Sequence, residues 1–243
     1  ERTRSALLSS VSHDMRTPLA AITGSASSLR DGSDAMSRET RRELAETISD
    51  EAERLNRLIG NLLDMTRLES GAVRARKEWH SVEEVVGAAL ARLEARLVDR
   101  PVRLALAPDL PLVPLDDVLF EQVVWNLVEN ADKYSPSGAP IEVSAAIEGR
   151  ELRLEVADRG VGLAPGEERR VFDKFYRGRE SVAQPGFGLG LTVCRGMIEA
   201  HSGTIVAAPR PGGGTVFTVR LPIEGVPPAV EAEADEAPLG GSP

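Results

Sequence analysis

The residues best suited to chemistry are one histidine near the start of the chain and glycine clusters far downstream. His13 lies in the run from Ser12 to Leu19, Ser-His-Asp-Met-Arg-Thr-Pro-Leu. Neutral imidazole is a good nucleophile near pH 7, because its ordinary pKa lies close to that value. A histidine on one element and a phosphate-cradling apparatus on another together predict a chain that phosphorylates itself.

A helix expected over residues 116–133 carries polar side chains along one side. Asn126, Asn130 and Lys133 are spaced by four and three residues, so they project in the same direction. An amide oxygen suits Mg²⁺, and a lysine on the same stripe can meet a phosphate. Asparagines that merely cap neighbouring loops are the alternative, which is weaker for three aligned residues than for one.

A carboxylate follows a predicted strand at the sequence Asp158-Arg159-Gly160-Val161-Gly162. A carboxylate at a strand end can accept a hydrogen bond from the amino group of adenine. It would repel the carbonyl that guanine presents at the same place, which would select ATP. An ordinary Asp-Gly turn is the alternative for this motif taken alone.

A second glycine cluster, Gly186-Phe187-Gly188-Leu189-Gly190, precedes a helix expected over residues 189–201. Glycines let backbone N–H groups approach an anion, and a helix N-terminus favours negative charge. The cluster does not follow a strand as a dinucleotide-binding fingerprint requires, so a Rossmann fold is disfavoured.

The stretch between the two glycine clusters predicts a mobile lid. Phe172 and Phe175 are candidate anchors, and Lys174, Arg177 or Arg179 is a candidate cation for the phosphates. Surface charge on a loop is the alternative reading of these three cations.

The elements that must position these groups divide the chain into four parts. Helices over about 1–29 and 37–69 form an antiparallel hairpin, which buries too little alone and is expected to pair with a copy as a four-helix bundle. An intramolecular bundle with later helices is the alternative.

The later part of the chain predicts an α+β sandwich. Its expected helices lie near 82–97, 116–133 and 189–201, and its expected strands lie near 102–107, 141–147, 152–157, 204–208 and 215–221. We expect a hairpin domain over 1–70, a linker over 71–80, an ATP-binding domain over 81–223 and a disordered acidic tail over 224–243.

Composition excludes several classes of function. The net charge of −9 argues against general nucleic-acid binding. No apolar run approaches the roughly 20 residues that span a bilayer. The chain opens at Glu1 inside a predicted helix, so we expect a fragment or processed product, cytoplasmic in itself or as the cytoplasmic portion of a membrane-anchored sensor. Cys194, the one cysteine, is expected to be an inert buried thiol.

The ordered set of motifs resembles the transmitter region of two-component sensor histidine kinases. The set comprises the His13 run, the asparagine helix, Asp158-x-Gly-x-Gly, Phe-x-x-Phe and Gly-x-Gly-x-Gly, and it covers residues 1–223. Residues 16–24 are most similar to potassium-responsive sensor kinases. The resemblance implies a dimerisation and phosphoacceptor hairpin joined to an ATP-binding domain of the type shared with gyrase and heat-shock chaperones.

The resemblance also implies roles for individual residues. His13 would be the phosphoacceptor, Asp14 would orient or deprotonate its imidazole, and Thr17 would position a water that hydrolyses a phosphoaspartate on the partner. Asn130 would be a ligand of Mg²⁺. The residues implied for ATP, Mg²⁺ and the lid are Asn126, Asn130, Lys133, Tyr134, Asp158, Gly160, Gly162, Lys174, Arg177, Gly186, Gly188 and Gly190.

The same resemblance implies partners. The chain would form a homodimer through its hairpin and would pass the phosphoryl group to an aspartate of a response regulator receiver domain, with no nucleic-acid partner. Two rivals remain: an ATPase or chaperone of the same nucleotide fold, in which His13 is incidental, and a non-enzymatic dimer scaffold with a degenerate pocket. His80, in the connector, and His201, at a helix end, are poor acceptor candidates.

Overall fold

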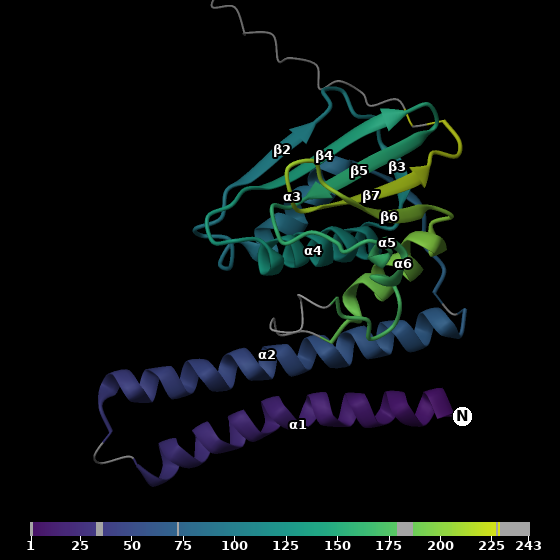
Figure 1. The fold of residues 1–243 in the computed structure, drawn as a ribbon. Helices are drawn as coiled ribbons and strands as arrows, with labels where there is room; N and C mark the ends of the chain where they lie inside the picture. The colour runs from purple at the N-terminus through teal and green to yellow at the C-terminus, as the bar shows by residue number, and fades with distance from the viewer. Residues whose placement is uncertain (1, 33–35, 72, 179–186, 227, 229–243) are drawn as a thin grey trace, which may run out of the picture.

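The computed structural model describes residues 2–32, 36–71, 73–178, 187–226 and 228, with the backbone alone described for residues 2–14. Three layers follow one another in Figure 1: a β-sheet, a layer of helices beneath it, and a long helical hairpin. The sheet and its helices form the expected α+β sandwich. The hairpin precedes the sandwich in the chain, as expected.

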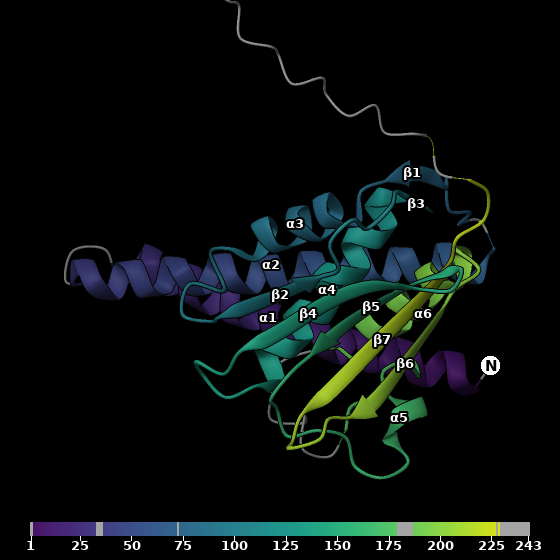
Figure 2. The same ribbon diagram turned by 90° about the horizontal axis from the view of Figure 1, so that it is seen from above.

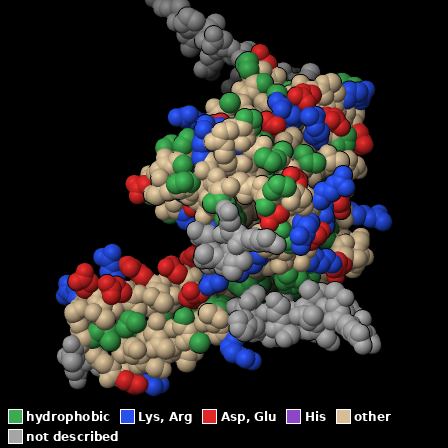
Figure 3. Space-filling view, in the orientation of Figure 1, with side chains coloured by type: hydrophobic (Ala, Val, Ile, Leu, Met, Phe, Trp, Pro, Cys, Tyr) green, Lys and Arg blue, Asp and Glu red, His purple; other side chains and the backbone are tan. Residues whose placement is uncertain are grey.

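The hairpin consists of α1 (Arg2–Asp31) and α2 (Arg38–Glu69), which lie antiparallel and side by side (Figures 1 and 2). Ser37 caps α2, because its Oγ accepts a hydrogen bond of 3.0 Å from the Thr40 N–H. Pro18 lies inside α1, where it removes one helical N–H donor. Figure 3 shows the turn end of the hairpin projecting beyond the sandwich, with charged side chains along its upper side.

The sheet positions Asp158 directly after its central strand β5 and Thr215 at the start of the neighbouring strand β7. Its order is β2-β4-β5-β7-β6, with β2 parallel to β4 and every other pair antiparallel. Side chains of β5 alternate, so that Leu152, Leu154 and Val156 are buried while their neighbours are less so. The strand bounds are β2 (Val102–Leu106), β4 (Ile141–Glu148), β5 (Glu151–Ala157), β6 (Thr204–Pro209) and β7 (Thr215–Pro222).

Helices cover one face of this sheet. Those of the layer are α3 (Val82–Leu93), α4 (Asp117–Tyr134), α5 (Glu167–Arg170) and α6 (Gly190–Ala200). Phe120, Leu127 and Val193 are fully buried between α4, α6 and the sheet. Cys194 is buried in the same core, and burial raises the pKa of its thiol to about 12, as an inert packing residue requires.

Several local elements differ from those expected. The helix expected near 82–97 ends at Leu93, and α5 was not expected. A two-stranded antiparallel sheet joins β1 (Glu78–His80) to β3 (Val113–Leu115), so the end of the stretch expected as a linker, including His80, is a strand. Three-residue strands carry too short an alternation to be recognised in a sequence, and Pro114 hides the second of them.

The described helices include none that is both long and apolar enough to cross a bilayer.

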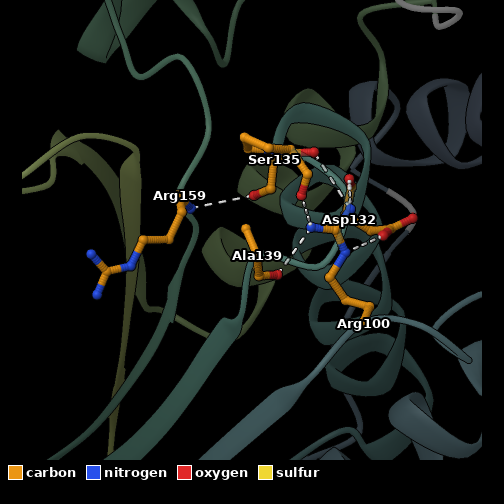
Figure 4. A network of polar contacts seen from close by, with 6 residues as sticks. Arg100, Asp132, Ser135, Ala139 and Arg159 are labelled. Carbon is orange, nitrogen blue, oxygen red and sulfur yellow. Dashed lines mark hydrogen bonds and ion pairs between the residues drawn. The ribbon is translucent and has the colours of Figure 1, made fainter.

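Arg100 ties the end of α4 to the loops around it (Figure 4). Its guanidinium donates to Asp132 Oδ1 at 2.7 Å and to the carbonyl oxygens of Asp132, Ser135, Pro136 and Ala139 at 2.7 to 3.4 Å. The last carbonyls of a helix lack partners within it, and a cation there also interacts favourably with the helix dipole. The Arg159 N–H reaches Ser135 Oγ at 3.3 Å, which joins the same helix end to the loop after β5.

Replacing Arg100 with methionine is expected to lower the free energy of unfolding by about 2–4 kcal/mol, because the stem is kept while several half-buried acceptors lose their donor. Urea unfolding of the whole chain measures the change. Arg103→Met is the matched control, since Arg103 is exposed on β2. Equal losses in the two variants would contradict the capping role.

Candidate functional site

A cavity of about 730 Å³ lies between α4, the loop after β5, the start of α6 and the side of α2. Most of the residues that the sequence motifs single out in the sandwich line this cavity. They are Asn126, Asn130, Lys133, Tyr134, Asp158, Gly162, Arg177, Gly188 and Gly190. Motifs that are separated by about 60 residues in the chain therefore meet at one place.

Asp158 follows β5 and is 4% exposed. Its Oδ1 accepts hydrogen bonds from the N–H groups of Gly160 at 2.7 Å and Thr215 at 3.0 Å. Burial raises the pKa of this carboxyl, and the two N–H groups oppose that shift. The Thr215 side chain also hydrogen-bonds to this carboxyl. Asp158 lines the cavity, where its carboxylate can accept a further hydrogen bond from an amine.

Two glycines around Asp158 are required by close backbone packing. A Cβ at Gly160 would lie 2.5 Å from the carbonyl oxygen of Tyr134. Gly214 has a φ of +100°, and a Cβ there would lie 2.2 Å from the Asp158 carbonyl oxygen. Gly160 therefore shapes the site from behind the cavity wall, and Gly214 belongs to the same packing.

The wall formed by α4 presents amides and charges. Asn126 is 3% exposed, and its buried Nδ2 makes no hydrogen bond within the described residues. Lys133 Nζ donates to the Tyr134 hydroxyl at 2.9 Å. Glu129, which also lines the cavity, forms ion pairs with Arg57 at 3.6 Å and with Arg96. The Asn126 side chain also interacts with the Cys194 thiol. A thiol is a weak acceptor, so the buried amide can still donate to a polar ligand.

The glycine cluster leads into the N-terminus of α6, as expected for an anion site. Gly188 has a φ of +66°, and a Cβ there would lie 2.6 Å from the Tyr176 carbonyl oxygen. A Cβ at Gly190 would approach Asn126 Oδ1 to 3.3 Å, so α4 and the start of α6 lie close together. Gly186 lies outside the described residues.

The structure does not bring every predicted lid residue to the cavity. Lys174 is not among the residues that line the cavity, and it forms an ion pair with Glu69 of α2. Phe172 is buried and packs edge-on against Phe217, with ring centroids 6.3 Å apart. Arg177 does line the cavity, whereas Arg179 lies outside the described residues.

The predicted acceptor region lies in α1. The backbone of His13 and Asp14 is helical, and their side chains lie outside the described residues. Thr17 is exposed on α1, and the adjacent Pro18 is buried.

The buried histidine of the sandwich has a structural role. His201 ends α6, and its Nδ1 bonds to the Met197 carbonyl at 2.7 Å while its Nε2 accepts the Asp116 N–H at 2.9 Å. Burial lowers the pKa of this imidazole, which suits the neutral form that these two bonds require. His201 thereby links the end of α6 to the N-cap of α4.

Sequence reasoning missed part of the lining. Thr215 and Phe217 come from β7, and Arg54, Arg57 and Asn61 come from α2. Polar residues of α2 read as the solvent side of an amphipathic helix, and no motif marked them. Only the packing of the hairpin against the sandwich turns that side toward a cavity.

The oxygen donors that line the cavity suit a magnesium ion that also binds water and phosphate. They do not form a metal site made of protein ligands alone. Among the described residues no group of three or more His, Cys, Asp or Glu could hold a metal. Mg²⁺ commonly takes only one or two protein oxygens and completes its shell with water and phosphate. Asn130 and Glu129 are neighbouring oxygen donors in the lining.

Comparisons with known families match two regions of the chain. Residues 3–71 match the His Kinase A (phospho-acceptor) domain, and residues 115–225 match the histidine kinase-, DNA gyrase B- and HSP90-like ATPase family. The first match spans the hairpin, and the second spans most of the elements that line the cavity.

Similar whole proteins include Sensor protein KdpD of Escherichia coli (strain K12), 45% identical over 97% of this chain and 26% of the relative. Sensor-like histidine kinase SenX3 of Mycobacterium tuberculosis (strain ATCC 25618 / H37Rv) is 34% identical over 91% of this chain and 54% of its own length. The chain thus spans about a quarter to a half of these relatives.

A solved structure, Acinetobacter baumannii histidine kinase AdeS, aligns with a TM-score of 0.69 and 26% identity. The alignment covers 88% of this chain and 98% of that one. The hairpin and the sandwich therefore recur together in a known structure.

Gly214→Ala is expected to destabilise the fold by about 1–3 kcal/mol more than Gly213→Ala, because only the first adds a clash to the strain of a positive φ. The two glycines share a φ of +100°, and a Cβ at Gly213 would have no atom within 4 Å. Urea unfolding of both variants measures the difference. Equal effects would mean that the contact with Asp158 does not limit this position.

Proposed function

The chain belongs to the sensor histidine kinases of two-component systems, and on that premise we propose that it is an ATP-dependent protein-histidine kinase that phosphorylates His13. The observation that carries the proposal is that Asn126, Asn130, Asp158 and the described part of the second glycine cluster line one cavity. This cavity lies in the region that matches the ATPase family, and His13 lies in the region that matches the phospho-acceptor domain.

In this proposal the adenine of ATP lies at the Asp158 end of the cavity. Asp158 Oδ1 is held by the Gly160 and Thr215 N–H groups, and the oriented carboxylate accepts a further hydrogen bond from the adenine amino group. A guanine carbonyl at that place would face the carboxylate, and the site would favour ATP over GTP.

The phosphates lie between α4 and the start of α6. The backbone N–H groups of the glycine cluster and the cations Lys133 and Arg177 face them, and Asn126 donates its buried amide N–H. Asn130, with Glu129 beside it, would hold Mg²⁺, which neutralises charge on the phosphates when bound.

The chemical step is an in-line phosphoryl transfer. A nitrogen of the His13 imidazole forms a bond to the γ-phosphorus while the bond to the β,γ-bridging oxygen breaks and ADP leaves. Asp14 orients the imidazole and accepts its proton. Alignment and charge stabilisation provide most of the rate in such reactions, so the protein must bring α1 of one hairpin to the cavity.

The hairpin would form the dimer interface, and its phosphorylated histidine would donate the phosphoryl group to the response regulator. Leu19, Ile59 and Leu63 are large apolar side chains exposed on the hairpin, and a second copy would cover such a face in a four-helix bundle. The phosphoryl group would pass to an aspartate of a response regulator, and Thr17 would support hydrolysis of that phosphoaspartate. In this proposal the functional units are the hairpin domain over 1–70 and the ATP-binding domain over 81–223, followed by the acidic tail from residue 224.

His13→Gln is expected to abolish uptake of γ-phosphate label into the whole chain, because no other side chain would receive the phosphoryl group. The label on the unsubstituted chain should be acid-labile and base-stable, as a phosphoramidate is. Incubation with γ-labelled ATP and Mg²⁺, followed by acid and base treatment, measures both properties.

His80→Gln, a histidine change in the strand β1, is the matched control and should retain the label. Label on the His13→Gln chain would remove the acceptor assignment. ATP hydrolysis without any phosphoprotein would instead favour an ATPase of the same fold.

Thr17→Ala is expected to slow dephosphorylation of the regulator by at least about tenfold while autophosphorylation persists, because a positioned water is lost. The decay of label on a response regulator that this chain has phosphorylated measures the rate. Thr23→Ala is the control on the same helix, where the Thr23 hydroxyl donates to the Leu19 carbonyl at 2.8 Å. Unchanged decay in Thr17→Ala would refute the phosphatase role.

A further inference from the structure

The hairpin and the sandwich are joined along the last turns of α2. Glu69 forms an ion pair with Lys174, and Leu68 packs so closely on α6 that a Cβ at Gly196 would lie 2.7 Å from Leu68 Cδ1. Leu58 and Met65, on the same helix, are buried. Figure 1 shows α2 running beneath α6. The preceding turns of α2 contribute Arg54, Arg57 and Asn61 to the lining of the cavity.

Arg54 is the residue of α2 whose surroundings call for a ligand. Its guanidinium carbon lies 5.3 Å from the centroid of the Phe187 ring, and Nη1 lies 3.3 Å from Glu51 Oε2. Its Nε is buried and makes no hydrogen bond within the described residues, although Arg54 lines the cavity. A buried donor of a charged group is costly without an acceptor.

The neighbours of Arg54 place its side chain beside the elements that the proposed function assigns to the phosphates. Phe187 directly precedes Gly188 of the glycine cluster, and Arg57, one turn further along α2, pairs with Glu129, the neighbour of Asn130. The two arginines of α2 thus adjoin the two elements to which the proposed function assigns the phosphates. Neither is a contact of Asp158, which the proposal assigns to adenine.

We propose that Arg54, with Arg57 beside it, binds the polyphosphate of the nucleotide, so that the hairpin contributes to the ATP site. A planar guanidinium matches the oxygens of a phosphate and can donate two hydrogen bonds to it. The inference rests on the proposed ATP site and adds that ATP binding there is coupled to the contact between α2 and the sandwich. Because both units then hold the same ligand, ATP stabilises the contact of α2 with the sandwich, and that contact raises the affinity for ATP by the same factor.

Titration calorimetry of the whole chain with Mg·ATP and with adenosine tests the proposal. Arg54→Gln is expected to weaken Mg·ATP binding about 5- to 20-fold, the range of one or two charge-assisted hydrogen bonds, while the affinity for adenosine stays the same. Adenosine carries no phosphate, so it reports on the adenine end alone. Arg54→Lys should restore part of the affinity, because it keeps the charge and loses the planar fork.

Arg42→Gln is the matched control. Arg42 lies on the same helix in an ion pair with Glu46 at 2.7 Å, with its side chain 80% exposed and outside the cavity lining. This variant should bind both ligands as the unsubstituted chain does.

Two outcomes would overturn the inference. The ratio of the Mg·ATP and adenosine affinities could be the same in Arg54→Gln and in the unsubstituted chain, and an equal loss for both ligands would then mark Arg54 as structural. In that case the unsubstituted chain still binds Mg·ATP, and the proposed function stands. A failure of the unsubstituted chain to bind Mg·ATP would overturn the proposed function together with this inference.

Discussion

The close packing of backbone around Asp158 is the constraint on which the site depends. The carboxylate is buried at the end of β5 and is fixed through Oδ1 by two backbone N–H groups. Those groups reach it only because Gly160 and Gly214 let neighbouring strands and α4 approach to distances that a side chain would forbid. The carboxylate therefore has a fixed direction, and a fixed acceptor selects one ligand edge over another at little cost in side-chain entropy.

A second set of polar contacts keeps the helix walls of the cavity in place. Arg100 satisfies the carbonyls at the end of α4, and the Arg159 N–H joins that end to the loop after β5. At the other end of α4, His201 accepts the N–H of the capping residue Asp116. Because both ends of α4 are held by groups distant in the chain, Asn126, Asn130 and Lys133 keep their positions relative to Asp158.

The contact between α2 and the sandwich relates the two halves of the proposed chemistry. One half is a nucleophile on α1, and the other is a nucleotide site in the sandwich, so transfer needs the hairpin and the cavity to meet. The ion pair between Glu69 and Lys174 and the packing of Leu68 on Gly196 hold α2 against the sandwich. Lys174 was predicted to be a cation for the phosphates, but it instead contributes to this contact between α2 and the sandwich.

The sequence by itself determined the hairpin, the sandwich and most of the site. Apolar spacing sets the helices and strands, and the motif residues lie on one side of a helix or in the loops that follow a strand. Asn126, Asn130, Asp158 and Gly188 could be named because local chemistry marks them. Only the tertiary structure decided that Arg54 and Arg57 face the cavity and that Thr215 holds Asp158. These residues look like ordinary surface or strand positions, because their role depends on which distant surface packs against them, and local spacing does not encode that.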